Sequence, residues 1–127
     1  DVPQDIDVLF YGTINPRRKQ LLQKISELGV DPNIIETYGA VSEPCALAMA
    51  NGVREKFNTQ LSIATTGIAG PDGGTKEKPV GLVYVAVSTE TQSICKKFRL
   101  FGNREQIIQR SSNAAIWMVK QVLTIPL

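Results

Sequence analysis

Short apolar runs are spaced along the chain between longer amphipathic stretches. Apolar and β-branched residues dominate segments 6–11, 61–66, 81–88 and 93–101, and this composition predicts buried strands. Only the polar connection TETQ separates the last two segments, so we expect them to pair as a hairpin. The pattern therefore predicts a sheet that contains at least one antiparallel pair of strands.

Three amphipathic stretches predict helices, because each has residues that favour a helix end. The first begins at Asn15 and stops at Gly29, and the second begins after a cap at Ser42. The third runs from a cap at Asn103 to about Leu123. Its expected apolar stripe consists of Ile107, Ile108, Ser111, Ala114, Ala115, Met118, Val119 and Val122. Strands that alternate with helices predict an α/β domain in which helices cover a mixed sheet.

Length and composition suit one soluble domain. The chain has 127 residues and a formal net charge of +2, and its basic residues are scattered along the sequence. We therefore expect a single domain over residues 1–127 that binds neither nucleic acid nor membranes. No apolar run approaches the ~20 residues of a membrane span. Two cysteines, Cys45 and Cys95, do not make a disulfide framework, which favours a cytoplasmic protein with reduced thiols.

The sequence contains no histidine, and this restricts the possible chemistry. Catalysis by Ser-His-Asp or Cys-His is excluded, and the commonest zinc ligand is missing. Proton transfer in an enzyme with this sequence would depend on lysine, tyrosine or a carboxylate. Asp72 is a single carboxylate among glycines, so we expect no metal site there.

The segment 65–81, TTGIAGPDGGTKEKPVG, joins two predicted strands. Its glycines allow backbone N–H groups to approach an anion closely, and its threonines and lysines add donors and positive charge. It matches neither G-x-x-x-x-G-K-[ST] nor G-x-G-x-x-G, and it leads into a strand rather than a helix. The residues alone leave two interpretations open: a loop that binds a phosphate-bearing ligand, or a structural connection.

Three segments resemble successive signature blocks of one protein family. They are YGAVSEP at 38–44, TTGIAGPDGGTKEKPVGLVYVAV at 65–87 and FGNREQIIQR at 101–110. The family is the CinA C-terminal domain, the nicotinamide mononucleotide deamidases, and the resemblance covers essentially the whole chain. It implies a three-layer α/β/α domain with a mixed sheet. The implied reaction hydrolyses the carboxamide of nicotinamide mononucleotide to nicotinic acid mononucleotide and ammonia, in pyridine nucleotide salvage.

The resemblance also implies a set of substrate-binding residues. Thr66 and Gly67 match positions that line the family's active site, and Arg104 matches an arginine that contacts the substrate phosphate. A guanidinium at a helix N-terminus suits a phosphate, although an ordinary surface arginine is the alternative for Arg104. The resemblance further implies a homo-oligomer without metal or cofactor. Trp117 could mark a subunit interface, or it could serve packing within the domain.

The family's nucleophile is a serine in an S-x-T-G-G segment, assisted by a lysine and a tyrosine, and this sequence contains no such segment. By the resemblance, Tyr11 matches the tyrosine and Lys24 matches the lysine, with Lys19 as the alternative lysine. A solvated helix face for the lysines and a strand end for the tyrosine are equally compatible with the pattern.

The missing serine segment bears on what the chain represents. In the family that segment precedes the block that DVP, at residues 1–3, resembles. We therefore expect a fragment of a longer protein that lacks the family's N-terminal nucleophile segment. The alternative function is an inactive CinA-like paralogue or fragment that binds a nucleotide or another protein.

Two further features have structural explanations. Ser42 and Glu43 could be a catalytic hydroxyl and carboxylate, but a helix cap with an acid in the first turn explains both. Cys45 follows in the first turn of the same predicted helix, where a thiol can become reactive. Without a histidine or a neighbouring cysteine, a partly buried, inert thiol is the favoured interpretation.

Overall fold

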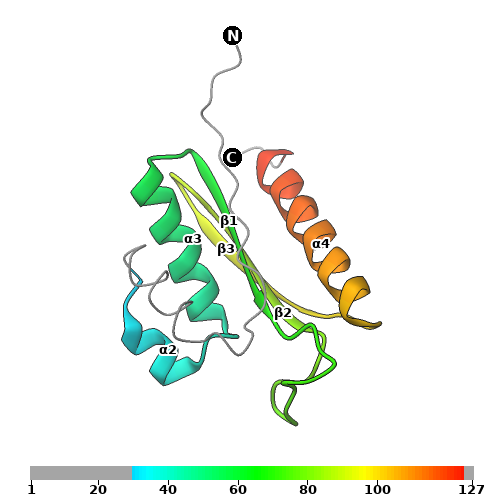
Figure 1. The fold of residues 1–127 in the computed structure, drawn as a ribbon. Coiled ribbons are helices and arrows are strands. Elements are labelled where there is room, and N and C mark those ends of the chain that lie inside the picture. The colour runs from blue at the N-terminus through cyan, green and yellow to red at the C-terminus, as the bar shows by residue number, and fades with distance from the viewer. Residues whose placement is uncertain (1–29, 125–127) are drawn as a thin grey trace.

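A three-stranded sheet lies between layers of helices in the structure, a computed structural model that describes residues 30–124 (Figure 1). The strands are β1 (Leu61–Gly67), β2 (Leu82–Thr89) and β3 (Ser93–Arg99), in the order β1-β2-β3. Both pairs are antiparallel, and the register places Ala86 between Ala64 and Cys95. β2 is therefore the central strand of the described sheet.

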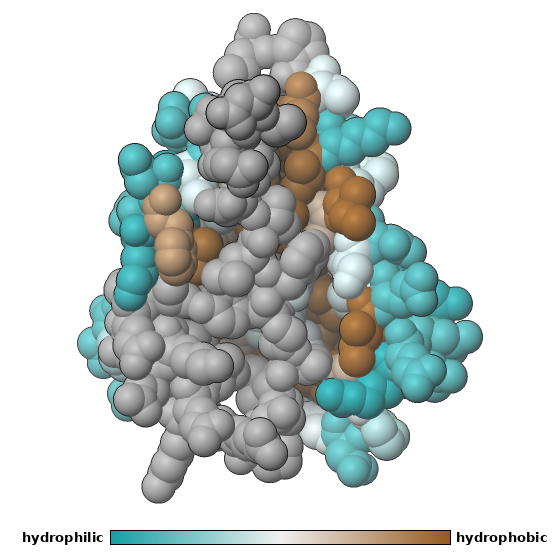
Figure 2. Space-filling view, turned by 45° about the horizontal axis from the view of Figure 1, so that its top comes forward, coloured by the Kyte–Doolittle hydropathy of each residue, from teal (hydrophilic) through white to brown (hydrophobic). Residues whose placement is uncertain are grey.

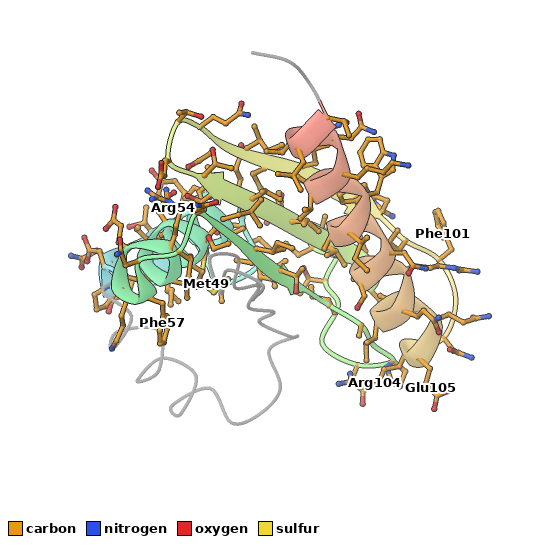
Figure 3. The ribbon with its side chains drawn as sticks, turned by 90° about the horizontal axis from the view of Figure 1, so that it is seen from above. Met49, Arg54, Phe57, Phe101, Arg104 and Glu105 are labelled. Carbon is orange, nitrogen blue, oxygen red and sulfur yellow. The ribbon has the colours of Figure 1, made fainter. Side chains whose placement is uncertain are left out.

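Helices cover both faces of this sheet. Helix α3 (Glu43–Phe57) lies on one face with α2 (Pro32–Tyr38) beside it, and α4 (Arg104–Thr124) lies on the other face (Figures 1 and 3). This layer order confirms the predicted three-layer α/β/α arrangement.

Side chains of different size fill the two interfaces. Small residues line the contact with α3: Ala46 and Ala50 on the helix meet Ala64 and Ala86 on the strands. They let the helix lie close to the sheet, where the Ser62 hydroxyl donates to the Ala50 carbonyl over 2.5 Å. The interface beneath α4 is built from Leu61, Ile63, Val83, Val85, Val87, Ile107, Ala115 and Met118. Because both faces are covered, β1 is buried along its whole length.

Side-chain caps fix the starts of the two long helices. Ser42 Oγ accepts a hydrogen bond from Cys45 N over 3.3 Å, as expected for a helix cap, and donates to Gly39 O over 2.7 Å. Before α4, Asn103 and Gln106 form a capping box, in which each side chain accepts from the other's backbone N–H over 2.9 Å. Both helices therefore begin where the sequence predicts.

Two details differ from the sequence prediction. Ile108, placed on the apolar stripe of α4, is 45% exposed, because the buried face is centred on Ile107 and Met118. Helix α2 was missed. It has a cap at Asp31 and a proline at its first position, but it has seven residues and buries only Ile35, so it gives little periodic signal.

Two predicted elements, the strand at 6–11 and the helix at 15–29, lie outside the described residues. The expected mixed sheet would need a strand parallel to its neighbour, whereas the described strands are antiparallel throughout.

Apolar residues also reach the surface, and Figure 2 shows a band of them on one face, with hydrophilic residues along one side. Helix α4 contributes exposed apolar side chains at Ile108, Ile116, Trp117 and Leu123. Lys96 Nζ lies 4.6 Å from the centre of the Trp117 ring, a cation–π contact between β3 and α4. Within residues 30–124, no helix combines the length and apolar character needed to cross a membrane.

Candidate functional site

The connection between β1 and β2, residues 68–81, lies at the end of the sheet where α3 and α4 begin (Figure 1). The topology causes this arrangement, because β1 runs toward this end while β2 and both helices run away from it. The first turn of a helix has unpaired N–H groups and a partial positive charge. A glycine-rich loop and two helix starts therefore share one end of the molecule.

Backbone hydrogen bonds hold the base of the loop. Ile68 N donates to Leu82 O over 3.0 Å, and Gly81 N donates to Ile68 O over 2.7 Å. Leu100 N donates to Gly81 O over 2.8 Å, which ties the loop to the end of β3. Gly81 has a φ of +96°, and a Cβ atom there would lie 1.9 Å from Leu100 O. Only glycine fits this position.

Thr66 and Gly67 end β1 directly before the loop, and both are buried. Thr66 Oγ1 donates to Ala40 O over 2.8 Å, a contact between the strand and the turn before α3. A Cβ atom at Gly67 would lie 2.7 Å from Val83 Cγ2 and 2.8 Å from Leu82 O. The close approach of β2 therefore requires glycine at this position.

Arg104 is the first residue of α4, and its side chain reaches the loop (Figure 3). Its Nη1 donates to Gly70 O over 2.8 Å, so the structure brings together the start of α4 and the glycine-rich segment. The guanidinium has five N–H donors, and this bond uses one of them. The predicted position of Arg104 at a helix start is thus correct, and its contact with the loop is a new observation.

Lys78 makes a second contact from the loop, which the sequence prediction missed. Its Nζ donates to Tyr38 O over 2.8 Å, across a separation of 40 residues. The backbone of Lys78 belongs to a turn: Thr75 N donates to Lys78 O over 2.8 Å, and Lys78 N donates to Thr75 Oγ1 over 3.0 Å. No local sequence signal indicates such a distant partner.

Of the predicted site residues, the structure places Thr66, Gly67 and Arg104 at the loop end. Tyr11 and Lys24, together with the alternative Lys19, lie outside the described residues. Their assignment stays a prediction.

Both thiols are protonated at neutral pH. Burial raises the pKa of Cys45 to about 11, although the nearby Lys78 ammonium lowers it in part. Burial, followed by the negative charge of Glu43, raises the pKa of Cys95 to about 12. These pKa shifts agree with the predicted inert thiol at Cys45, which is fully rather than partly buried.

Two other features of residues 30–124 bear on possible sites. In that range no group of three or more Cys, Asp or Glu side chains gathers to hold a metal ion. An open hollow lined by Gln60, Leu61, Thr89, Glu90, Thr91 and Leu123 lies at the hairpin end of the sheet. It is therefore separate from the loop.

Fold and site define a class of protein: a three-layer α/β/α domain in which an arginine at a helix start meets a glycine-rich loop. The model of the CinA C-terminal domain matches residues 20–123, and the chain belongs to this family. The resemblance of the three sequence blocks is thereby confirmed.

Individual relatives agree with this membership. A CinA-like protein of Mycobacterium avium is 48% identical over 106 residues, which cover 80% of this chain and 24% of that protein. A CinA-like protein of Gemmatimonas aurantiaca is 53% identical over 93 residues, which cover 73% of this chain and 22% of that protein. The chain thus spans less than a quarter of the length of these curated relatives.

A solved structure gives the same result. The crystal structure of the competence/damage inducible protein CihA from Agrobacterium tumefaciens matches with a TM-score of 0.75 and 36% identity. The match covers 80% of this chain and 62% of that chain. The fold class is therefore shared with the CinA superfamily.

Proposed function

We propose that this chain forms the nucleotide-binding part of a nicotinamide-nucleotide amidohydrolase. The reaction would convert nicotinamide mononucleotide and water to nicotinic acid mononucleotide and ammonia. The observation that carries the proposal is the hydrogen bond between Arg104 and Gly70, because it joins a guanidinium at a helix start to the glycine-rich loop. The family membership and the sequence blocks support the same ligand class.

The phosphate of the nucleotide would bind at this junction. Unpaired N–H groups at the start of α4 and backbone N–H groups of the loop both favour an anion. Arg104 adds a full positive charge and can bind two phosphate oxygens with the donors that Gly70 does not use. Thr66 and Gly67, at the end of β1, would line the part of the site that receives the nicotinamide.

Hydrolysis of the carboxamide needs an oxygen nucleophile on the amide carbon and a proton for the departing ammonia. A sequence without histidine leaves lysine, tyrosine or a carboxylate for these proton transfers. We assign them to Tyr11 and Lys24, with Lys19 as the alternative lysine. These residues would assist the nucleophile of the family, the serine of the S-x-T-G-G segment. The sequence of this chain does not contain that segment.

Calorimetric titration of the chain with nicotinamide mononucleotide tests the binding. Replacing Arg104→Gln should weaken binding by roughly 10- to 100-fold, because a charge-assisted contact to phosphate is lost. Arg99→Gln is the matched control, since it removes the same charge from an exposed residue of β3 and should leave binding unchanged. Nicotinamide riboside, which has no phosphate, should bind the wild type and Arg104→Gln equally weakly.

An ammonia-release assay with the same nucleotide, carried out on the full-length protein, distinguishes an enzyme from a non-catalytic binding module. Ammonia release together with nicotinic acid mononucleotide would support the amidohydrolase. Tight binding without turnover would instead support the non-catalytic nucleotide-binding module. If the wild type does not bind the nucleotide, or if Arg104→Gln binds as tightly as Arg99→Gln, the proposed site is wrong.

A further inference from the structure

Lys78 connects the glycine-rich loop to the turn between α2 and α3. The hydrogen bond from its ammonium to Tyr38 O is 2.8 Å long. The Thr75–Lys78 turn fixes the backbone from which the side chain extends. A lysine loses considerable rotamer freedom when it is held in one place, so a specific contact across 40 residues needs a reason.

The surroundings of the ammonium are shaped to receive it. A Cβ atom at Gly39 would lie 2.7 Å from Lys78 Nζ, so the absence of a side chain there leaves room for the cation. Gly39 also has a φ of +83°, which favours glycine. The Lys78 charge reaches Cys45 in the first turn of α3, whose pKa it lowers. The ammonium therefore sits among α2, α3 and the loop.

The turn that Lys78 contacts also holds Thr66. Thr66 Oγ1 donates its hydrogen to Ala40 O, two residues after Tyr38. A threonine hydroxyl has one hydrogen and two lone pairs. In this arrangement Thr66 can only accept a hydrogen bond from a ligand. A carboxamide NH₂ group can donate such a bond, whereas a carboxylate has no hydrogen to donate.

We propose that Lys78 is a positioning residue that fixes the turn at 38–40, so that Thr66 offers an acceptor and favours a carboxamide over a carboxylate. The inference rests on the proposed function, because it concerns the ligand of that same site. Thr66 would make the contact, and Lys78 would act through the turn. The consequence is selectivity for the amide substrate over the acid product.

The test uses Lys78→Met with Lys97→Met as control, since Lys97 is an exposed lysine on β3. The first measurement is amide hydrogen exchange over residues 38–42, which needs no ligand. The second is the ratio of affinities for nicotinamide mononucleotide and nicotinic acid mononucleotide. Lys78→Met should speed the exchange roughly ten-fold or more and reduce the affinity ratio several-fold. Lys97→Met should change neither, and Lys78→Arg, which keeps a donor, should retain most of both.

Each outcome decides a separate point. If Lys78→Met exchanges like Lys97→Met over residues 38–42, the positioning role is wrong. If exchange increases while the affinity ratio stays constant, Lys78 holds the turn but does not set selectivity, and the proposal is overturned. If the wild type binds neither nucleotide, the proposed function is wrong, and the selectivity proposed for Thr66 is wrong with it. The hydrogen-exchange comparison needs no ligand, so it still tests whether Lys78 holds the turn.

Discussion

The two ends of the sheet are both held by side-chain hydrogen bonds between distant segments, but the bonds differ in kind. At the hairpin end, side chains bond to side chains: Arg54 Nε donates to Ser88 Oγ over 3.0 Å, and Ser88 Oγ donates to Asn51 Oδ1 over 2.6 Å. At the loop end, Arg104 and Lys78 donate to backbone carbonyls instead.

This difference separates a structural end from a functional one. The fully buried Ser88 hydroxyl both accepts and donates within its network, so it has little capacity left for a ligand. A guanidinium or ammonium with one bond to a carbonyl keeps further donors and its whole charge. We therefore expect mutations at the hairpin end to change stability, and mutations of Arg104 and Lys78 to change binding.

The largest expected effect tests whether the base of the loop is itself part of the folded framework. Gly81→Ala should lower the free energy of unfolding by about 3 kcal/mol or more, because a Cβ atom would collide with the Leu100 carbonyl at a positive φ. Gly73→Ala is the matched control: its φ is +93°, but the nearest atom is 3.8 Å from the new Cβ. It should lose about 1–2 kcal/mol.

Urea denaturation of both variants and the wild type measures this comparison. Equal losses at the two glycines would show that the collision at Gly81 is relieved by movement of the loop base. The loop would then be attached to the sheet more loosely than its backbone hydrogen bonds indicate.

The sequence predicted those parts of the fold that depend on neighbouring residues, namely the buried strands and the starts of the two long helices. β1 and β2 are buried on both faces, so they are visible as apolar runs. The caps at Ser42 and Asn103 have local partners three residues away and could be read directly. Helix α2 escaped prediction because it buries one side chain.

The site was predictable only as a set of separate residues. The glycine-rich composition marks the loop, and a helix cap places Arg104 at a helix start. The partners Gly70 and Tyr38 lie 34 and 40 residues from the side chains that bind them, and no pattern of residues encodes such distances. The roles of Tyr11 and Lys24 stay predictions.

A smaller effect is expected at the hairpin end. Ser88→Ala should cost about 1–3 kcal/mol of stability, because Arg54 Nε and the Asn51 side chain each lose a buried partner. Ser93→Ala is the control: the exposed Ser93 also donates to Asn51, over 2.7 Å, but water can replace it. Thermal denaturation measures stability, and calorimetric titration should show unchanged nucleotide affinity in both variants. A loss of affinity in Ser88→Ala would show that the two ends are coupled.

The smallest effect concerns Cys45, in the first turn of α3 near the loop end. Its pKa is raised from 9.0 to about 11 in the folded protein, so folding favours the protonated thiol. This contribution to stability is complete below pH 9 and is lost as the pH rises toward 11. Cys45→Ala should therefore show a shallower loss of stability than the wild type across this range, measured by urea denaturation at several pH values. Cys95→Ala should show the same change extended toward pH 12. Parallel profiles for the wild type and both variants would mean that burial does not hold these thiols protonated, and that other groups cause the alkaline loss.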